Sequence, residues 1–213
     1  MTPAEELTRA ALALEQRGLN SGTSGNASVR TDGGFLVTPS ALPAERLEPA
    51  AMVELGLDGT IRSGGVPSTE WRIHRDVYRA FRRAGAVVHT HSPYATALAA
   101  LREDLPAFHY LVGKAGGHVV RCAAYATFGS QELSDAVVAA LGDRRACLMA
   151  NHGALAYGGD LDAALALATE VEVLARQYLI ARSAGTPVLL TAAQMDAAIA
   201  QFAHYEGQDD SKE

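Results

Sequence analysis

The spacing of apolar residues along the chain predicts several amphipathic helices. Residues Thr2 to Glu5 are typical of the start of a helix. The Thr2 hydroxyl can accept hydrogen bonds from the free backbone amides of the first turn, Pro3 suits the first helical position, and Glu5 completes a capping box. Further along, Leu, Ala and Val recur at the three-to-four-residue spacing of a helix face. The pattern places helices from Pro3 to about Gly18, at about 69–84, from 93, at about 131–141, at about 162–184 and from about 191 onward.

Shorter apolar runs bounded by Gly, Asn and Asp predict strands near 26–30, 34–38, 52–55, 60–62, 86–91 and 146–150. Asp58-Gly59 separates two of these runs and is a hairpin signal. Strands and helices alternate without regular βαβ spacing, so we expect a mixed α/β fold with a central, largely antiparallel sheet flanked by helices on both faces. One domain should cover residues 1–213, with a mobile polar tail at about 206–213.

Composition narrows the function classes. The 213 residues carry a net charge of −6, so there is no overall basic character to attract nucleic acid. No stretch is long and uncharged enough to cross a bilayer, and the first residues lack the layout of a secretory signal. Cys122 and Cys147 belong to no CxxC pair, which favours reduced thiols. We therefore expect a cytoplasmic protein that binds neither nucleic acid nor membranes.

Two histidines on one strand are the most informative chemical signal. Side chains alternate faces along a strand, so His89 and His91 of the 86–91 run point to the same side. Two such imidazoles suit a divalent metal, and Zn²⁺ in particular if a third His and a carboxylate reach the same point. His152, just after the 146–150 strand, and Glu70 are the candidates for these two positions. The alternative for any single His in an apolar strand is a packed core histidine.

Glu70 is expected in the first turn of the 69–84 helix, where the helix dipole favours a carboxylate. Such a group can bind a metal at rest and serve as a base when substrate arrives, although a helix-capping role alone would also explain it. His74 follows four residues later on the same helix, so it could pair with Glu70 or merely pack. The remaining histidines, His109, His118 and His204, lack comparable geometry.

Three polar segments are candidates for binding an anion such as phosphate. Gly25-Asn26 lies in a glycine-rich turn whose amides could form a nest, Ser40-Ala41 follows a strand, and Ser68-Thr69 begins a helix. Each is also what an ordinary loop or cap looks like. No basic residue accompanies them, so a bound phosphate would rely on neutral donors. Schiff-base chemistry would instead need Lys114, the only lysine outside the C-terminal tail.

Together these segments resemble the class II aldolase/adducin family over essentially the whole chain. The resemblance is carried by Ser24-Gly25-Asn26-Ala27-Ser28, Pro67-Ser68-Thr69-Glu70-Trp71, Val88-His89-Thr90-His91, His109-Tyr110, the segment 124–129, Asn151-His152-Gly153 and the helical segment 170–175. It implies one Zn²⁺ per subunit, held by Glu70, His89, His91 and His152. It also implies a substrate phosphate held by Gly25, Asn26, Ser40, Ala41, Ser68 and Thr69, although Ala41 replaces the family's usual glycine.

The resemblance further implies a four-fold symmetric homotetramer with sites at subunit interfaces. Tyr110 and Phe128 would be substrate-facing aromatics from an adjacent subunit, and Tyr205 would lie on a mobile C-terminal segment that covers the site. The implied reaction is reversible cleavage of a ketose 1-phosphate, such as L-fuculose 1-phosphate, to dihydroxyacetone phosphate and an aldehyde such as L-lactaldehyde. Glu70 would transfer the proton at carbon, and Tyr110 or Tyr205 would serve the aldehyde oxygen. Alternatives are a sugar-acid phosphate decarboxylase, a ketose phosphate epimerase, or a non-catalytic adducin-like scaffold without a working metal site.

Overall fold

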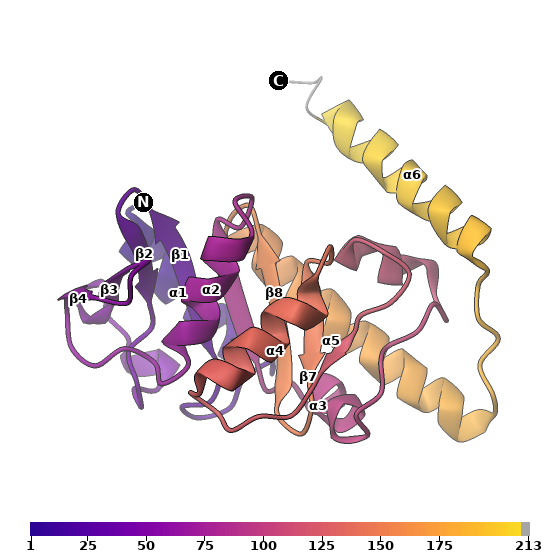
Figure 1. Ribbon diagram of the computed structural model, residues 1–213, viewed down its shortest axis with the longest axis horizontal. Helices are drawn as coiled ribbons and strands as arrows, with labels where there is room; N and C mark the ends of the chain where they lie inside the picture. Colours follow the sequence, from indigo (N-terminus) through magenta and orange to yellow (C-terminus); the bar gives the residue numbers. More distant parts are fainter. Residues whose placement is uncertain (210–213) are drawn as a thin grey trace.

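A single sheet organises the protein in the computed structural model, which describes residues 1–209 apart from the side chains of Ala203 and of residues 205–209 (Figure 1). Its strands are β1 (Asn26–Thr31), β2 (Gly34–Val37), β3 (Val53–Gly56), β4 (Ile61–Ser63), β5 (Ala86–Thr90), β6 (Cys122–Ala123), β7 (Ala146–Met149) and β8 (Gly153–Gly158). The α-helices are α1 (Pro3–Gln16), α2 (Trp71–Ala80), α3 (Pro93–Ala100), α4 (Gln131–Leu141), α5 (Leu161–Ala184) and α6 (Ala192–Asp209). Short 3-10 helices are η1 (Ala44–Arg46), η2 (Pro49–Ala51) and η3 (Tyr110–Ala115).

The strands lie in the order β4-β3-β2-β1-β5-β8-β7-β6. Neighbouring strands pair antiparallel except for the parallel pair β6–β7, which confirms the expected mixed sheet. The β1–β5 register sets Asn26 opposite His89 and Ser28 opposite Val87. Strand β8 was not expected, because every residue of Gly153–Gly158 is buried and the run shows no alternation of polar and apolar residues.

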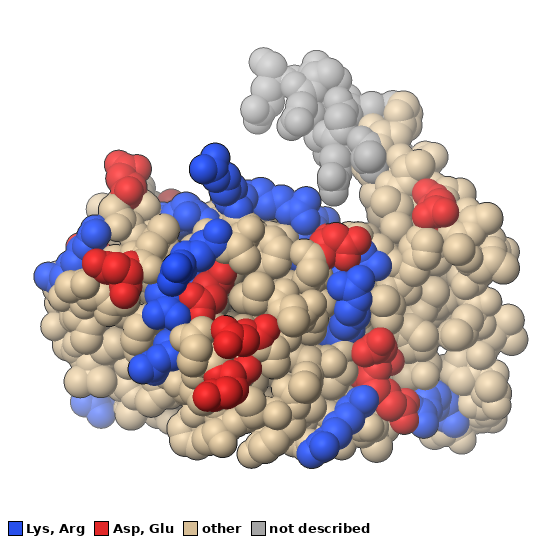
Figure 2. Space-filling model, viewed as in Figure 1, with Lys and Arg blue, Asp and Glu red and all other residues tan. Residues whose placement is uncertain are grey.

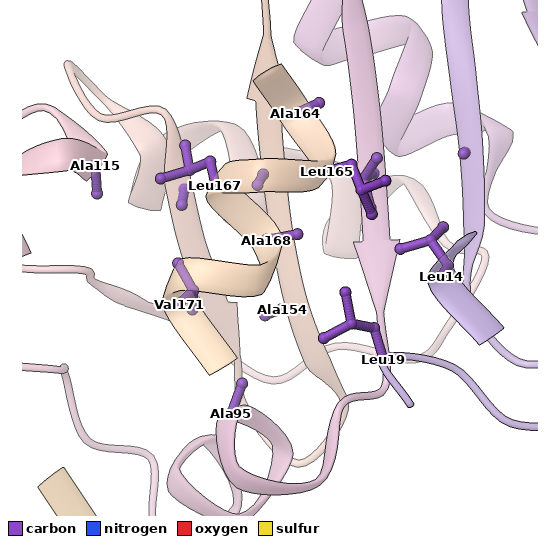
Figure 3. Packing of buried hydrophobic residues seen from close by; sticks show 14 of the residues in the cluster. Leu14, Leu19, Ala95, Ala115, Ala154, Ala164, Leu165, Leu167, Ala168 and Val171 are labelled. Atoms are coloured by element: carbon purple, nitrogen blue, oxygen red, sulfur yellow. The ribbon is translucent and has the colours of Figure 1, made fainter. Parts of the chain in front are cut away.

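Helices cover both faces of this sheet, as expected. On one face, α1, α3 and α5 pack against small apolar residues such as Ala86 and Val88 of β5. Figure 3 shows Leu165 of α5 directed toward Leu14 of α1 on this side. On the other face, α2 and α4 pack against residues that include Val87. Side chains at odd positions of β5 therefore face the layer formed by α2 and α4, and this sets the direction of His89.

Helix α2 is shorter than the expected helix at 69–84. It ends at Ala80, and Phe81 is extended. The reason is a long-range contact from β1: the guanidinium of Arg30 donates to the carbonyl oxygens of Tyr78, Phe81 and Ala84 at 2.7–3.1 Å. These carbonyls are therefore satisfied without continuation of the helix. At the other end, Glu70 occupies the N-cap position rather than the first turn itself.

Helix α6 projects from the body of the molecule (Figure 1). It is attached through η3, where the ring of Phe202 stacks on Tyr110 with centroids 6.0 Å apart, and through Met195, which is fully buried. Of the tail expected at 206–213, residues 206–209 belong to this helix, and 210–213 lie outside the described residues. Acidic and basic side chains are interspersed over the face shown in Figure 2. Within the described chain, none of the helices combines the length and apolar character needed to cross a membrane.

Candidate active site

The four candidate metal ligands converge at one point. Nε2 of His89 lies 2.9 Å from Nε2 of His91 and 3.0 Å from Oε2 of Glu70. Nε2 of His152 lies 3.2 Å from Oε1 of Glu70. The three imidazole rings are nearly equidistant, with centroids 4.8–4.9 Å apart. One ligand atom from each of the four residues lies within 4.8 Å of every other.

Local structure explains how residues so distant in sequence meet. His89 continues the row of β5 side chains that faces α2, and His91 follows the strand on the same side. His152 lies in the turn from β7 to β8, where Asn151 adopts a φ of 56°, a left-handed conformation that Asn tolerates. The next residue, Gly153, lies so close to β5 that an added Cβ would stand 2.1 Å from the Thr90 carbonyl oxygen. The turn therefore holds His152 directly beside β5.

This donor set fits a divalent cation. Nδ1 of His89 lies 3.0 Å from the carbonyl oxygen of Ala154, so Nδ1 donates and Nε2 presents a lone pair. That lone pair faces His91 and the carboxylate of Glu70, whose Oε1 is buried without a hydrogen-bond partner. Lone pairs at such spacing repel unless a cation or proton lies between them. Zn²⁺ with tetrahedral bonds of ~2.0–2.1 Å sets its ligand atoms about 3.3 Å apart, close to the 2.9–3.2 Å found between three pairs of these atoms.

Electrostatics lead to the same conclusion. Burial raises the pKa of Glu70, but the charge and hydrogen bond of His89, the charge of His152 and the hydrogen bond from Asn26 together hold the pKa of this carboxyl well below its usual range. Burial lowers the pKa of His89, but the Glu70 carboxylate outweighs it and raises the pKa. Burial, followed by the charge of His89, lowers the pKa of His91 to about 4 and also lowers the pKa of His152. These shifts keep Glu70 ionised and keep His91 and His152 neutral, the forms in which carboxylates and imidazoles bind metals.

A cavity of about 400 Å³ opens onto this cluster. All six residues expected to bind phosphate line it: Gly25, Asn26, Ser40, Ala41, Ser68 and Thr69. The amides of Ser40 and Ser68 donate to the carbonyl oxygens of Val66 and Thr38, so these two residues offer hydroxyls rather than amides to a ligand. Among the described residues that line the cavity, none is Lys or Arg, so an anion there would be held by neutral donors.

The remaining candidates are placed differently. Phe128 lines the cavity of its own chain, although it was expected to come from an adjacent subunit. Tyr110 is half exposed, stacks on His109 with centroids 4.8 Å apart and lies outside the cavity of its own chain. The side chain of Tyr205 lies outside the described residues. Nζ of Lys114 pairs with Glu170 at 3.0 Å, away from this cavity. Six further lining residues were given no site role from the sequence, although four of them lie within segments singled out there: Thr23, Ser24, Pro39, Tyr125, Ala126 and Asn151.

Known proteins resemble this chain in sequence and in fold. Residues 5–179 match the family model of the class II aldolase and adducin N-terminal domain. The chain is 46% identical over 199 residues to a 5-methylthioribulose-1-phosphate/5-deoxyribulose-1-phosphate aldolase of Rhodospirillum rubrum, which covers 93% of this chain and 90% of that protein. It is 43% identical over 185 residues to the L-fuculose phosphate aldolase of Escherichia coli K12, and this alignment covers 87% of this chain and 86% of that protein. A solved structure of an L-fuculose 1-phosphate aldolase superposes with a TM-score of 0.92 at 36% identity, over 94% of this chain and 96% of the other. This chain therefore belongs to the class II aldolase and adducin family.

Proposed function

We propose that this class II aldolase catalyses the zinc-dependent, reversible cleavage of a ketose 1-phosphate to dihydroxyacetone phosphate and an aldehyde. The observation that carries the proposal is the convergence of Glu70, His89, His91 and His152 beside a cavity whose other wall is rich in hydroxyls. A non-catalytic scaffold would not need all four ligands, whereas here each is present and in reach of the others.

The residues of the cavity divide the reaction between them. Zn²⁺ at the cluster would supply a Lewis acid for the negative charge that develops on the C2 and C3 oxygens of the ketose. The hydroxyls of Ser40, Ser68 and Thr69 would hold the phosphate as neutral donors. When the C3–C4 bond breaks, the C4 hydroxyl would pass its proton by way of Tyr110 or Tyr205 to the Glu70 carboxylate, C4 would leave as the aldehyde, and the electron pair of the bond would stay with C3. Glu70 would then deliver that proton to C3, and in synthesis it would remove a proton from C3.

Two substrate classes follow from the relatives. L-fuculose 1-phosphate would give L-lactaldehyde, whereas a 5-deoxyribulose 1-phosphate would give acetaldehyde, which lacks the hydroxyl-bearing carbon of lactaldehyde. The 46% identity to the Rhodospirillum rubrum enzyme supports the pentulose as a second candidate. A sugar-acid phosphate decarboxylase or a ketose phosphate epimerase would release carbon dioxide or return an isomer of the substrate. Product analysis with this small panel of phosphates therefore separates the four reactions.

The decisive test is Glu70→Gln, assayed for retro-aldol cleavage together with zinc content by elemental analysis. We expect zinc to remain bound through the three histidines and turnover to fall by about 10²-fold or more, the scale of a lost general base. Glu132→Gln is the matched control, because Glu132 is exposed on α4 and should leave turnover unchanged. Near-normal turnover of Glu70→Gln with zinc bound would remove Glu70 from the reaction.

We propose in addition that the enzyme is a cytoplasmic homotetramer in which Tyr110, and Tyr205 of the C-terminal helix, complete the site of a neighbouring subunit. The position of Tyr110 outside its own cavity supports shared sites. Oligomers assembled from a mixture of Glu70→Gln and Tyr110→Phe subunits test this idea, since each variant alone is expected to be inactive. If sites are shared, the cavity of a Tyr110→Phe subunit regains an intact site when its neighbour is a Glu70→Gln subunit that supplies Tyr110. Recovery of activity on mixing is expected, and its absence in verified mixed oligomers would show that each subunit works alone.

A further inference from the structure

Five polar side chains lie buried between α2 and β1, in a layer made mostly of apolar residues. Glu70, His74 and Tyr78 follow each other at intervals of four residues, and Asn26 and Ser28 are two apart on β1. Four helical residues rise about 6 Å and two strand residues about 6.6 Å, so the two rows remain in step. None of the five residues is more than 7% exposed, and His74 and Ser28 are completely buried.

These side chains form one continuous chain of hydrogen bonds that ends at Glu70. The hydroxyl of Tyr78 lies 2.7 Å from Oγ of Ser28, which lies 2.6 Å from Nδ1 of His74. Nε2 of His74 lies 2.5 Å from Oδ1 of Asn26. Nδ2 of Asn26 then donates to Oε2 of Glu70 at 3.1 Å. His74 therefore reaches Glu70 through Asn26 rather than by direct pairing.

The direction of every donor in this chain follows from its last acceptor. An ionised Glu70 can only accept, so Asn26 must turn its amide nitrogen toward the carboxylate and its oxygen toward His74. His74 must then donate from Nε2, which leaves Nδ1 as an acceptor for the Ser28 hydroxyl. Ser28 has in turn only a lone pair left for the Tyr78 hydroxyl. Burial, with a smaller effect from His89, lowers the pKa of His74 to about 3, so the neutral ring required here is the stable form.

We propose that Tyr78, Ser28 and His74 are positioning residues that fix the Asn26 amide, so that Asn26 holds Glu70 by Oε2 and leaves Oε1 as the oxygen that exchanges the proton. Oε1 is the carboxylate oxygen without a hydrogen-bond partner, and it lies on the side of His152. The inference rests on the proposed role of Glu70 in the aldol reaction. It also changes the expected role of Asn26, because an amide committed to both His74 and Glu70 has only one N–H left for a phosphate.

The first test is independent of activity. A long-range ¹H–¹⁵N spectrum of the zinc-loaded protein, with the His74 signals assigned from their loss in His74→Gln, should show Nε2 protonated and Nδ1 unprotonated. A protonated Nδ1 would reverse the donor order between Ser28 and Asn26 and overturn the proposal. The spectrum is recorded on the protein without substitutions, and His74→Gln serves only to assign its signals.

The second test compares turnover in variants that remove buried hydrogen bonds at two places. Ser28→Ala and His74→Leu interrupt the chain, whereas His74→Gln keeps one donor and one acceptor in similar places. Ser134→Ala is the matched control, since Ser134 is equally buried and hydrogen-bonded but belongs to the α4–α2 contact with Asp76. With zinc saturating, we expect kcat of Ser28→Ala and His74→Leu to fall about 10–100-fold, the usual effect of residues that orient metal ligands. KM for the ketose phosphate should stay within about 3-fold, and His74→Gln should restore most of kcat.

Equal kcat in Ser28→Ala and Ser134→Ala at equal folded fractions would overturn the proposal. A kcat of His74→Gln as low as that of His74→Leu would also overturn it. Should Glu70→Gln itself retain full turnover, the aldol role of Glu70 would fail. The spectrum of His74 would then still decide whether the donor order is correct. The two failures are therefore distinguishable.

Discussion

Replacing Ala41 by glycine should stabilise this protein, although the same replacement weakens most proteins. Ala41 lies in the turn after β2, lines the cavity and adopts a φ of 57°. In this left-handed region the Cβ crowds the following carbonyl, which glycine avoids. Ala41 therefore carries conformational strain that glycine would not.

The size of the effect is a difference between two terms. Relief of the left-handed conformation should contribute about 1–2 kcal/mol. Glycine also makes the unfolded chain more flexible, which costs about 0.4–1 kcal/mol. The two ranges give a net gain in the free energy of unfolding of about 0–1.6 kcal/mol, with a central value of about 0.8 kcal/mol, or a rise in Tm of about 2–3 °C for a chain of this length.

Calorimetry or urea unfolding of Ala41→Gly measures this gain directly. Ala124→Gly is the matched control, because Ala124 is also an exposed loop alanine but is not among the residues with positive φ. Only the entropy cost applies there, so Ala124→Gly should lower stability. Equal loss of stability in both variants would show that the turn at Ala41 relaxes without cost and that the strain argument is wrong.

Three further outcomes are expected. His91→Ala should lower the zinc content of the purified protein, measured by elemental analysis, and full occupancy would remove His91 from the ligand set. Gly153→Ala should destabilise the protein by about 1–3 kcal/mol and weaken zinc binding, since its Cβ would clash with the Thr90 carbonyl, whereas Gly159→Ala, with open space around its Cβ, should not. Burial raises the pKa of Asp76, but hydrogen bonds from three neighbouring side chains outweigh it and hold the pKa below its usual value. The unfolded chain therefore takes up this proton at higher pH, so stability should fall as pH drops below about 4, and Asp76→Asn should flatten that slope in pH-dependent unfolding.

Local patterns were sufficient to predict much of the fold and to align two of the four candidate metal ligands. The capping box at Thr2 and Glu5 is formed, and α4 ends before Gly142 as expected. The two-residue period of β5 correctly aligned His89 with His91. These predictions depend on neighbours in sequence, for which hydrophobic periodicity and capping chemistry are direct evidence.

Features fixed by distant contacts could not be predicted in this way. The early end of α2 depends on Arg30 of β1, which is distant from the helix in sequence but in contact with it in space. Strand β8 is buried on both faces, so its sequence carries no alternation to reveal it. The link from His74 to Glu70 through Asn26 depends on how β1 packs against α2, which the sequence does not give directly. The spacing of the polar residues, four apart along α2 and two apart along β1, could nevertheless have indicated that the two rows meet.

The order in which the ligands occur along the chain bears on how the enzyme acquires its metal. Glu70 comes first and His152 last, and the Ala154 carbonyl that fixes the ring of His89 comes later still. A growing polypeptide lacks His152 until the turn after β7 has left the ribosome, and it lacks the carbonyl that fixes the tautomer of His89 until β8 has followed. We therefore expect metal uptake to be a late step of biosynthesis, because the centre is complete only after β5, β7 and β8 have paired.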